Sequence, residues 1–426
     1  MRKQISPARG MNGAIVLPGD KSISHRYAML ASIAEGVTKI GNYSTGADCQ
    51  STLSCVQALG AVIERTDGLL TIHGRGLDGL HGPVEALDAG NSGSTIRMLS
   101  GILAAQRFDT RIGGDESLSG RPMNRIIRPL TEMGASIEAR DGQYPPLTIH
   151  GRTLQPIRYE LPVASAQVKS CVLLAGLFAE GRTTVIESIP TRDHTEIALA
   201  EFGADVDRLK GTITVTGRPR LEGRELTVPG DLSSAAFFLV AALIVEESNL
   251  VIRGVGLNPT RSTLLDALAE MGADLKILDV AQSGGELVGD LRVRKSRIRG
   301  GTIEKARTAA LIDEIPVLAV LGAASEEGLV VRDAAELRLK ETDRIATIAE
   351  NFRRMGLQIE TRPDGFEVPG RQRFHAAELD SRGDHRIAMA FSIAALAADG
   401  PCAIDGAEAA DVSFPEFFAT LQRLAE

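Results

Sequence analysis

Residues 17–36 read LPGDKSISHRYAMLASIAEG, a turn rich in Gly, Asp and Ser followed by a helix that is apolar on nearly every side. The same order of features returns five more times along the 426-residue chain, beginning at residues 86, 161, 228, 311 and 379. A helix that is apolar on all faces is buried inside a domain. These six segments are therefore predicted to form the core of the protein.

A second series of helices, amphipathic rather than apolar, runs between these segments. They end on a glycine and pass into an alternating strand, with tails that read LGAVIE, MGASIE, FGADVD, MGADLK and MGLQIE. A sixth helix, FPEFFATLQRLAE, closes the chain. The copies of the first series start 67 to 83 residues apart, which accommodates a strand–helix–strand–helix–strand unit. Six units predict two domains of three.

The near-identity of LPGD at 17 and VPGD at 228 suggests where the chain passes from one domain to the other. We expect a discontinuous domain of residues 1–18 and 229–426 and a second domain of residues 19–228. The N-terminus of each buried helix offers unpaired N–H groups and the positive end of the helix dipole. Six such ends facing one space would form a receptor for anions.

The composition excludes several classes of protein. A net charge of -8 argues against a nucleic-acid partner, so positive charge that binds anions must be concentrated locally. Four cysteines without CxxC spacing indicate neither a zinc site nor a disulfide framework, which fits a reducing cytoplasm. The longest apolar runs are too short to span a bilayer, and the first residues lack the apolar core of a secretory signal.

Polar residues at the helix starts are the candidates for chemistry. In the first copy, Lys21 and Ser22 lie one turn before Arg26 and form a phosphate-binding pattern, although the same residues would suit a solvated face. In the second copy, the turn GNSGST places Gly93 where a backbone can approach a ligand closely, or where Asn91 or Ser92 caps the helix. The pattern GxxxxGK[ST] of nucleotide-binding loops is absent.

Later copies repeat this arrangement. Ser165 is a helix cap, while Gln167 and Lys169 are predicted to face a polar space. Asp313 either caps its helix or acts as a base beside bound anions. The runs KETDR at 340–344 and GDHR at 383–386 are solvated charges in one interpretation, and in the other they extend the pattern of basic helix starts. Independent solvated charges would not follow a repeat, so the second interpretation is favoured.

Together LPGDKSISHR, GNSGSTIR, GRPM, SAQVKS, RLKETDRI and GDHRIAMA resemble the 5-enolpyruvylshikimate-3-phosphate synthase family over nearly the whole chain. The resemblance implies an α/β fold, a two-domain inside-out barrel of six βαβαββ repeats with buried parallel helices and an active site in the cleft between the domains. It implies no metal and no organic cofactor. We expect a cytoplasmic monomer whose partners are small-molecule substrates, with no nucleic acid and no membrane.

Members of this family move the enolpyruvyl group of phosphoenolpyruvate to the 5-hydroxyl of shikimate 3-phosphate, through a tetrahedral intermediate that then loses phosphate. The resemblance implies binding of shikimate 3-phosphate by Lys21, Ser22, Arg26, Ser165, Gln167, Arg192, Asp313 and Lys340. It implies binding of phosphoenolpyruvate by Lys21, Gly93, Arg121, Gln167, Arg344 and Arg386. Catalysis would fall to Asp313 as base at the 5-hydroxyl, Glu341 at the methylene carbon, Lys21 and His385.

Three positions depart from the common family pattern and bear on affinity. These are Val412 in place of a lysine, Glu336 in place of an asparagine and Ala166 in place of a serine. Gly93 is retained, which predicts inhibition by the phosphoenolpyruvate mimic glyphosate. Two other functions stay open: enolpyruvyl transfer to UDP-N-acetylglucosamine, although that family's cysteine is missing near Arg121, and non-catalytic binding of phosphorylated metabolites.

Overall fold

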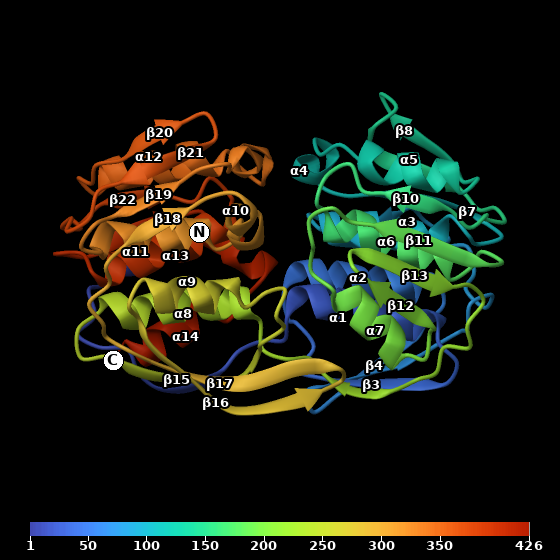
Figure 1. The fold of residues 1–426 in the computed structure, drawn as a ribbon, viewed down its shortest axis with the longest axis horizontal. Helices are drawn as coiled ribbons and strands as arrows, with labels where there is room; N and C mark the ends of the chain where they lie inside the picture. The colour runs from blue at the N-terminus through green and yellow to red at the C-terminus, as the bar shows by residue number, and fades with distance from the viewer. Residues whose placement is uncertain (426) are drawn as a thin grey trace. The chain divides into compact units, whose positions relative to one another are not determined.

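The computed structural model describes residues 1–425 as two compact units, each with its own hydrophobic core (Figure 1). The first unit comprises residues 1–18, 229–281 and 287–426, and the second comprises residues 19–228 and 282–286. The short segment 282–286 joins the second unit although both of its flanks belong to the first.

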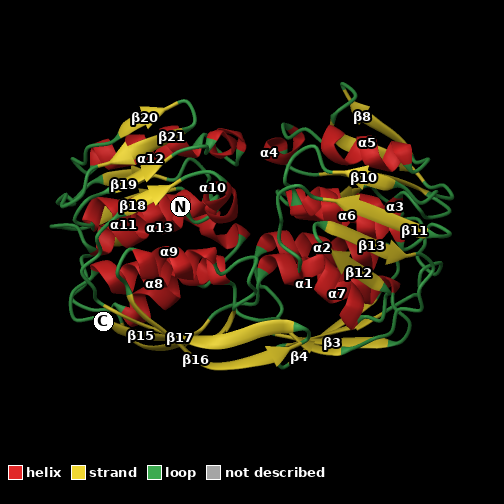
Figure 2. Ribbon diagram, viewed as in Figure 1, coloured by secondary structure: helices red, strands yellow, loops and turns green. Residues whose placement is uncertain are grey.

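Three buried helices form the centre of the second unit, and sheets and amphipathic helices surround them (Figure 2). The buried helices are α1 (Lys21–Ile33), α3 (Gly93–Leu103) and α6 (Ala166–Gly176). The outer helices are α2 (Ala47–Ala58), α5 (Asn124–Glu132) and α7 (His194–Glu201), with a single turn α4 (Glu116–Ser119).

Three four-stranded sheets belong to this unit. In spatial order the first is β14 (Glu225–Thr227), β3 (Val37–Gly41), β5 (Leu69–His73) and β4 (Val62–Thr66). The second is β6 (Leu87–Asp88), β7 (Asp109–Gly113), β9 (Tyr144–His150) and β8 (Ser136–Arg140). The third is β10 (Arg158–Glu160), β11 (Arg182–Ile186), β13 (Thr212–Thr216) and β12 (Val206–Leu209).

The first unit repeats this plan. Its buried helices are α8 (Leu232–Ile244), α11 (Ile315–Ala324) and α13 (His385–Leu396). Its outer helices are α9 (Thr263–Glu270), α12 (Arg344–Arg354) and α14 (Phe417–Leu424), joined by the short α10 (Ala306–Leu311) and by 3-10 turns at Ala335–Leu339 and Ala407–Val412.

Two four-stranded sheets and one three-stranded sheet enclose this core. The first contains β2 (Asn12–Val16), β15 (Asn249–Gly256), β17 (Glu286–Arg294) and β16 (Asp274–Ser283). The second contains β18 (Gly301–Ile303), β19 (Leu329–Val331), β21 (Gly365–Val368) and β20 (Glu360–Arg362). The third contains β22 (Glu378–Asp380), β23 (Cys402–Asp405) and β1 (Arg2–Ile5).

The order of strands explains how six repeats close into two units. In each four-stranded sheet a parallel pair precedes an antiparallel hairpin, as in β6, β7, β9 and β8. In the first sheet of the second unit, the strand parallel to β3 is β14, which comes from the C-terminal end of residues 19–228. The last strand of this unit thus pairs with its first. The α/β fold of strand–helix repeats around buried helices is thereby confirmed.

The buried helices begin at polar caps because their first N–H groups have no partner within the helix. Asp20 and Asp231 lie at matching places in LPGD and VPGD, and each accepts a hydrogen bond from a first-turn N–H at 2.9 Å. Ser92, Ser165 and Asp384 cap α3, α6 and α13 in the same way. Within residues 1–425 no helix has the length and apolar character needed to cross a membrane.

We expect Gly101→Ala to destabilise the second unit, because a Cβ at Gly101 would clash with the carbonyl oxygen of Cys171, where α3 packs on α6. Overpacking of this kind costs about 1–3 kcal/mol. Urea unfolding measures the loss. Gly301→Ala is the matched control, because its Cβ would come no nearer than 3.8 Å to Met271. Equal unfolding midpoints for the two variants would contradict the expected clash.

Candidate active site

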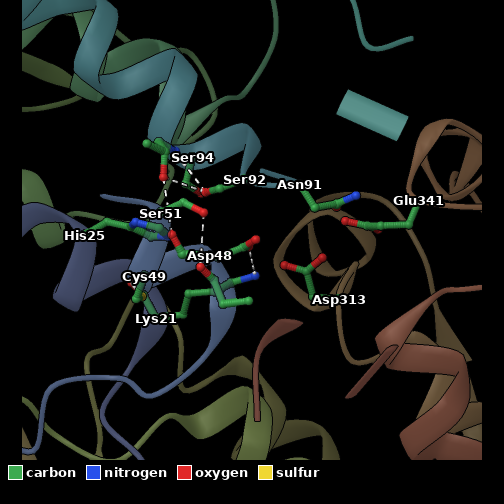
Figure 3. A network of polar contacts seen from close by, with 12 residues as sticks. Lys21, His25, Asp48, Cys49, Ser51, Asn91, Ser92, Ser94, Asp313 and Glu341 are labelled. Carbon is green, nitrogen blue, oxygen red and sulfur yellow. Dashed lines mark hydrogen bonds and ion pairs between the residues drawn. The ribbon is translucent and has the colours of Figure 1, made fainter. Parts of the chain in front are cut away.

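Lys21, the first residue of α1, reaches the carboxylate of Asp48 on α2 (Figure 3). Its Nζ donates to Oδ2 at 2.9 Å, and the lysine side chain stays 20% exposed while the aspartate is nearly buried. Asp48 also accepts, at its main-chain oxygen, a hydrogen bond from Thr95 Oγ1 on α3 at 3.4 Å. The lysine is thus held at the junction of three helix starts and remains accessible from solvent.

Arg26 lies one turn further along α1 and is almost buried, at 4% exposure. Its guanidinium donates to the main-chain oxygen of Ser22 at 2.7 Å, to Ser170 Oγ at 2.8 Å and to Thr195 Oγ1 at 2.5 Å. Burial lowers the pKa of Arg26 to about 10, against the opposing effect of the Glu196 carboxylate. The guanidinium therefore remains charged at neutral pH, in a place where water screens that charge weakly.

The turn at Gly93 brings a second group of basic side chains together. Gln167 on α6 accepts a hydrogen bond from Arg97 at 2.8 Å and donates one to Ser94 at 2.9 Å. A Cβ at Gly93 would lie 2.9 Å from Arg97 Nη1 and 3.7 Å from Arg121 Nη1. Glycine is therefore the residue that lets the backbone pass close to both guanidinium groups.

Arg121 is held by one residue of that same turn and by one residue of α4. Its Nη2 donates to Asn91 Oδ1 at 2.8 Å and to Ser117 Oγ at 2.9 Å. Ser165 and Arg192 are both partly exposed, the first at the cap of α6 and the second just before α7. The positive charge of Arg192 contributes to the lowered pKa of Arg26, so the two arginines are electrostatic neighbours.

Two sequence interpretations in this unit are resolved. Lys169 does not face a polar space: its side chain is fully buried, with Nζ 2.7 Å from Glu196 and 3.1 Å from Glu187. A buried ammonium is tolerated because two carboxylates compensate its charge. Ser165 accepts from the N–H of Val168 at 3.4 Å, so its predicted capping role is confirmed.

Arg344 is the centre of the charged group in the first unit. Its side chain is 1% exposed, and it pairs with Asp384 through Nε at 2.8 Å and with Glu341 through Nη2 at 2.6 Å. Burial alone would lower the pKa of Arg344, but the Asp384 and Glu341 carboxylates outweigh it and raise the pKa. KETDR is thus a partly exposed network around one buried arginine and not a solvated face, because α12 directs its first residue inward.

Asp313 lies beside the same arginine, with Oδ1 3.6 Å from Arg344 Nη1 and 3.7 Å from Lys340 Nζ. Figure 3 shows the Asp313 and Glu341 carboxyl groups close to one another. The residue before α11 that occupies the cap position is Glu314, so Asp313 is not the helix cap. Its carboxylate is placed between two cations.

Arg386 and His385 form the first turn of α13 and are both buried. Arg386 Nη1 lies 3.7 Å from Glu314, whose carboxylate also accepts a hydrogen bond from Ser233. Among the described residues, Nη1 of Arg386 and Nη1 of Arg344 have no hydrogen-bond partner although both atoms are buried. Two unsatisfied guanidinium donors in one unit are suited to a bound anion.

The sequence patterns did not reveal Asp48 or Glu196, and they gave Asp384 no role of its own. The buried carboxylates have no motif of their own, because their role is to pair with a cation from another helix. A signal was present for Arg97, which follows the GNSGST turn by two residues. In the part of the chain that the structure describes, no group of three or more His, Cys, Asp or Glu is placed to hold a metal ion.

Comparisons with known proteins agree with this geometry. A family model described as EPSP synthase (3-phosphoshikimate 1-carboxyvinyltransferase) matches residues 5–421. The chain is 65% identical to the 3-phosphoshikimate 1-carboxyvinyltransferase of Solibacter usitatus, with both sequences covered in full. It is 52% identical to that of Koribacter versatilis, over 99% of each sequence.

Solved structures give the same result for the fold. An EPSP synthase from Acinetobacter baumannii superposes with a TM-score of 0.89 at 43% identity, covering 99% of this chain and 98% of that one. The enolpyruvyl transferase NikO from Streptomyces tendae superposes with a TM-score of 0.78 at 18% identity, covering 99% and 96%. The second likeness is one of fold.

His25 provides a test of the buried polar network behind Lys21. Its Nδ1 lies 2.7 Å from Thr52 Oγ1, which is in turn 2.7 Å from Thr95 Oγ1, so α1, α2 and α3 are joined by one chain of hydrogen bonds. The imidazole is fully buried, so His25 serves packing and internal hydrogen bonding. Burial, assisted by the charges of Lys21 and Arg26, holds the pKa of His25 well below 6.5.

Stability should therefore fall as the pH drops below about 6.5, because the unfolded chain then binds a proton that the folded protein rejects. We expect wild type to lose about 1.4 kcal/mol more than His25→Gln between pH 7.5 and 5.5, since one pKa unit corresponds to that energy. Urea unfolding at both pH values measures it. Thr52→Val keeps the imidazole and should keep the wild-type pH dependence. Parallel curves for wild type and His25→Gln would refute the expectation.

Proposed function

Because the chain belongs to the family of EPSP synthases, the 3-phosphoshikimate 1-carboxyvinyltransferases, we propose that it moves the enolpyruvyl group of phosphoenolpyruvate to the 5-hydroxyl of shikimate 3-phosphate and releases phosphate. It is a transferase of the shikimate pathway, and the predicted family is confirmed. Identity over the full length to named 3-phosphoshikimate 1-carboxyvinyltransferases does not favour transfer to UDP-N-acetylglucosamine or a receptor without activity.

The observation that carries the assignment of phosphoenolpyruvate is the pair of buried Nη1 atoms on Arg344 and Arg386 that lack hydrogen-bond partners. A phosphorylated carboxylate would satisfy both donors with charge-assisted hydrogen bonds. We assign Gly93, Arg121 and Gln167 to the same substrate from the second unit. Lys21 would contact both substrates, because its ammonium is accessible while Asp48 fixes its direction.

Shikimate 3-phosphate is assigned to the helix starts around Arg26. Ser22, Ser165 and Arg192 would supply the remaining donors in the second unit, with Lys21 and Gln167 shared between the substrates. We assign Asp313 and Lys340 of the first unit to the same substrate, as the family resemblance implies.

The reaction needs a base at the attacking hydroxyl and an acid at the methylene carbon. Asp313 suits the first task, because Lys340 and Arg344 lie within 3.7 Å and favour its ionised form. Glu341 suits the second, with His385 assisting. Departing phosphate would be stabilised by the surrounding cations. We propose a cytoplasmic monomer.

Asp313→Asn and Glu341→Gln should each lower kcat by about 10²–10⁴-fold, because each removes a group that transfers a proton. The measurement is phosphate release with both substrates present, over a range of pH. Glu350→Gln is the control and should retain wild-type kcat, because this carboxylate of α12 pairs with Arg354 and Arg382. Turnover with UDP-N-acetylglucosamine in place of shikimate 3-phosphate, or release from neither mixture, would contradict the proposed reaction.

Glyphosate should inhibit competitively with phosphoenolpyruvate, and Gly93→Ala should raise its Ki by about 10–200-fold, the range of one misplaced methyl group. The new Cβ would displace Arg97 and crowd a ligand longer than phosphoenolpyruvate. Steady-state rates across a concentration series of both ligands give the constants. An unchanged Ki, or a KM for phosphoenolpyruvate that rises as much as the Ki, would count against the assigned position of Gly93.

A further inference from the structure

The tip of the β16–β17 hairpin packs into the second unit, although both strands lead back to the first. Gly284 and Gly285 form the turn with φ of +53° and +76°, as a two-residue hairpin turn of the primed type requires. Tyr27 on α1 donates a hydrogen bond to the main-chain oxygen of Gly284 at 3.4 Å. A Cβ at Gly285 would lie 2.8 Å from Ile197 of α7. The tip is therefore seated against two helices.

Glu286, the residue that follows the turn, is unusual for a hairpin tip because its side chain is 2% exposed. Its Oε1 lies 2.7 Å from Nδ1 of His194, which is buried to the same degree. Burying an ionised carboxylate without a hydrogen-bond or charge partner would cost much free energy, so the contact with His194 matters for the folded structure. The negative charge of Glu286 also raises the pKa of Arg26, so the field of the carboxylate extends to α1.

His194 begins α7, and the residues on either side of it connect this helix to two arginines that we assign to shikimate 3-phosphate. Arg192 lies two residues earlier, in the loop that leads into the helix. Thr195, the next residue, accepts from Arg26 Nε at 2.5 Å and also contacts Ser170 on α6. Glu196 binds the buried ammonium of Lys169 at 2.7 Å. The first turn of α7 thus holds Arg26 by a hydrogen bond, and Arg192 lies in the loop that enters this turn.

We propose that Glu286 is a positioning residue for shikimate 3-phosphate. Through His194 it fixes the first turn of α7, and this turn sets the places of Arg192 and Arg26. The inference rests on the assignment of these two arginines to shikimate 3-phosphate. Phosphoenolpyruvate is assigned to other residues, so its binding is not expected to depend on the hairpin tip.

Glu286→Gln retains the shape of the side chain and removes its charge. We expect the KM for shikimate 3-phosphate to rise about 10-fold, within the range of indirect couplings, with kcat and the KM for phosphoenolpyruvate within about 2-fold of wild type. Calorimetric titration with shikimate 3-phosphate alone should show the same loss of affinity. Glu286→Asp, which restores the charge, should recover part of it.

Glu201→Gln is the matched control, because this half-buried carboxylate ends α7 beside the tip, where its Oε2 would lie 3.8 Å from a Cβ at Gly285. It should leave all three constants within about 2-fold of wild type. His194→Gln tests the other end of the contact and serves if Glu286→Gln does not fold. The double variant should raise the KM for shikimate 3-phosphate little more than either single variant does, since both substitutions break the same interaction.

Arg192→Ala separates this inference from the site assignment. A raised KM for shikimate 3-phosphate in Arg192→Ala, together with an unchanged value in folded Glu286→Gln and His194→Gln, overturns the role of Glu286 alone. An unchanged KM in Arg192→Ala overturns the assignment of that arginine, and with it the reason for the positioning role. A lower unfolding midpoint in Glu286→Gln without any change in KM reduces the pair to a structural contact.

Discussion

A helix that is apolar on every side can present polar groups only at its ends, and the rest of this protein follows from that constraint. α8 is the clearest case, since all thirteen of its residues are buried. Strands and outer helices must cover such a helix completely, which produces the repeated enclosure of three helices by three sheets. The chemistry is then confined to the helix starts, where caps, dipoles and basic side chains occur together.

Charge compensation decides which of these basic side chains remain available. Lys169 is fully paired with two glutamates, whereas Lys21 has one aspartate and partial exposure. Arg344 has three acidic neighbours and still keeps one nitrogen without a hydrogen bond. A chain with net charge -8 can hold anions only where such local excess persists. The same acidic side chains that neutralise most cations therefore define where the remaining ones can act.

The sequence allowed the fold to be predicted because the repeat appears in local patterns: apolar helices, glycine tails and caps. The candidate site residues at the helix starts could be identified for the same reason. Asp48 and Glu286 could not, because a buried carboxylate that pairs with a distant helix leaves no local pattern. Glu286 lies in the sequence SGGELVG, which has no local sign of a buried carboxylate. Only the packing of the hairpin turn against His194 reveals its burial.

The two units use the same helix start in opposite ways. LPGD and VPGD each provide an aspartate cap, but Lys21 in α1 corresponds to Leu232 in α8 by position after the cap. Ser22 is partly exposed, whereas its counterpart Ser233 is buried and accepts a hydrogen bond from Arg261 at 2.6 Å. Ser233 in turn donates to Glu314, which lies beside Arg386. The polar groups at the start of α8 are thus bound to other residues of the protein, and through Glu314 they support Arg386 of a later repeat. The two helices share the aspartate cap that starts them. The polar positions after the cap can therefore differ, binding a ligand in one repeat and supporting the fold in another.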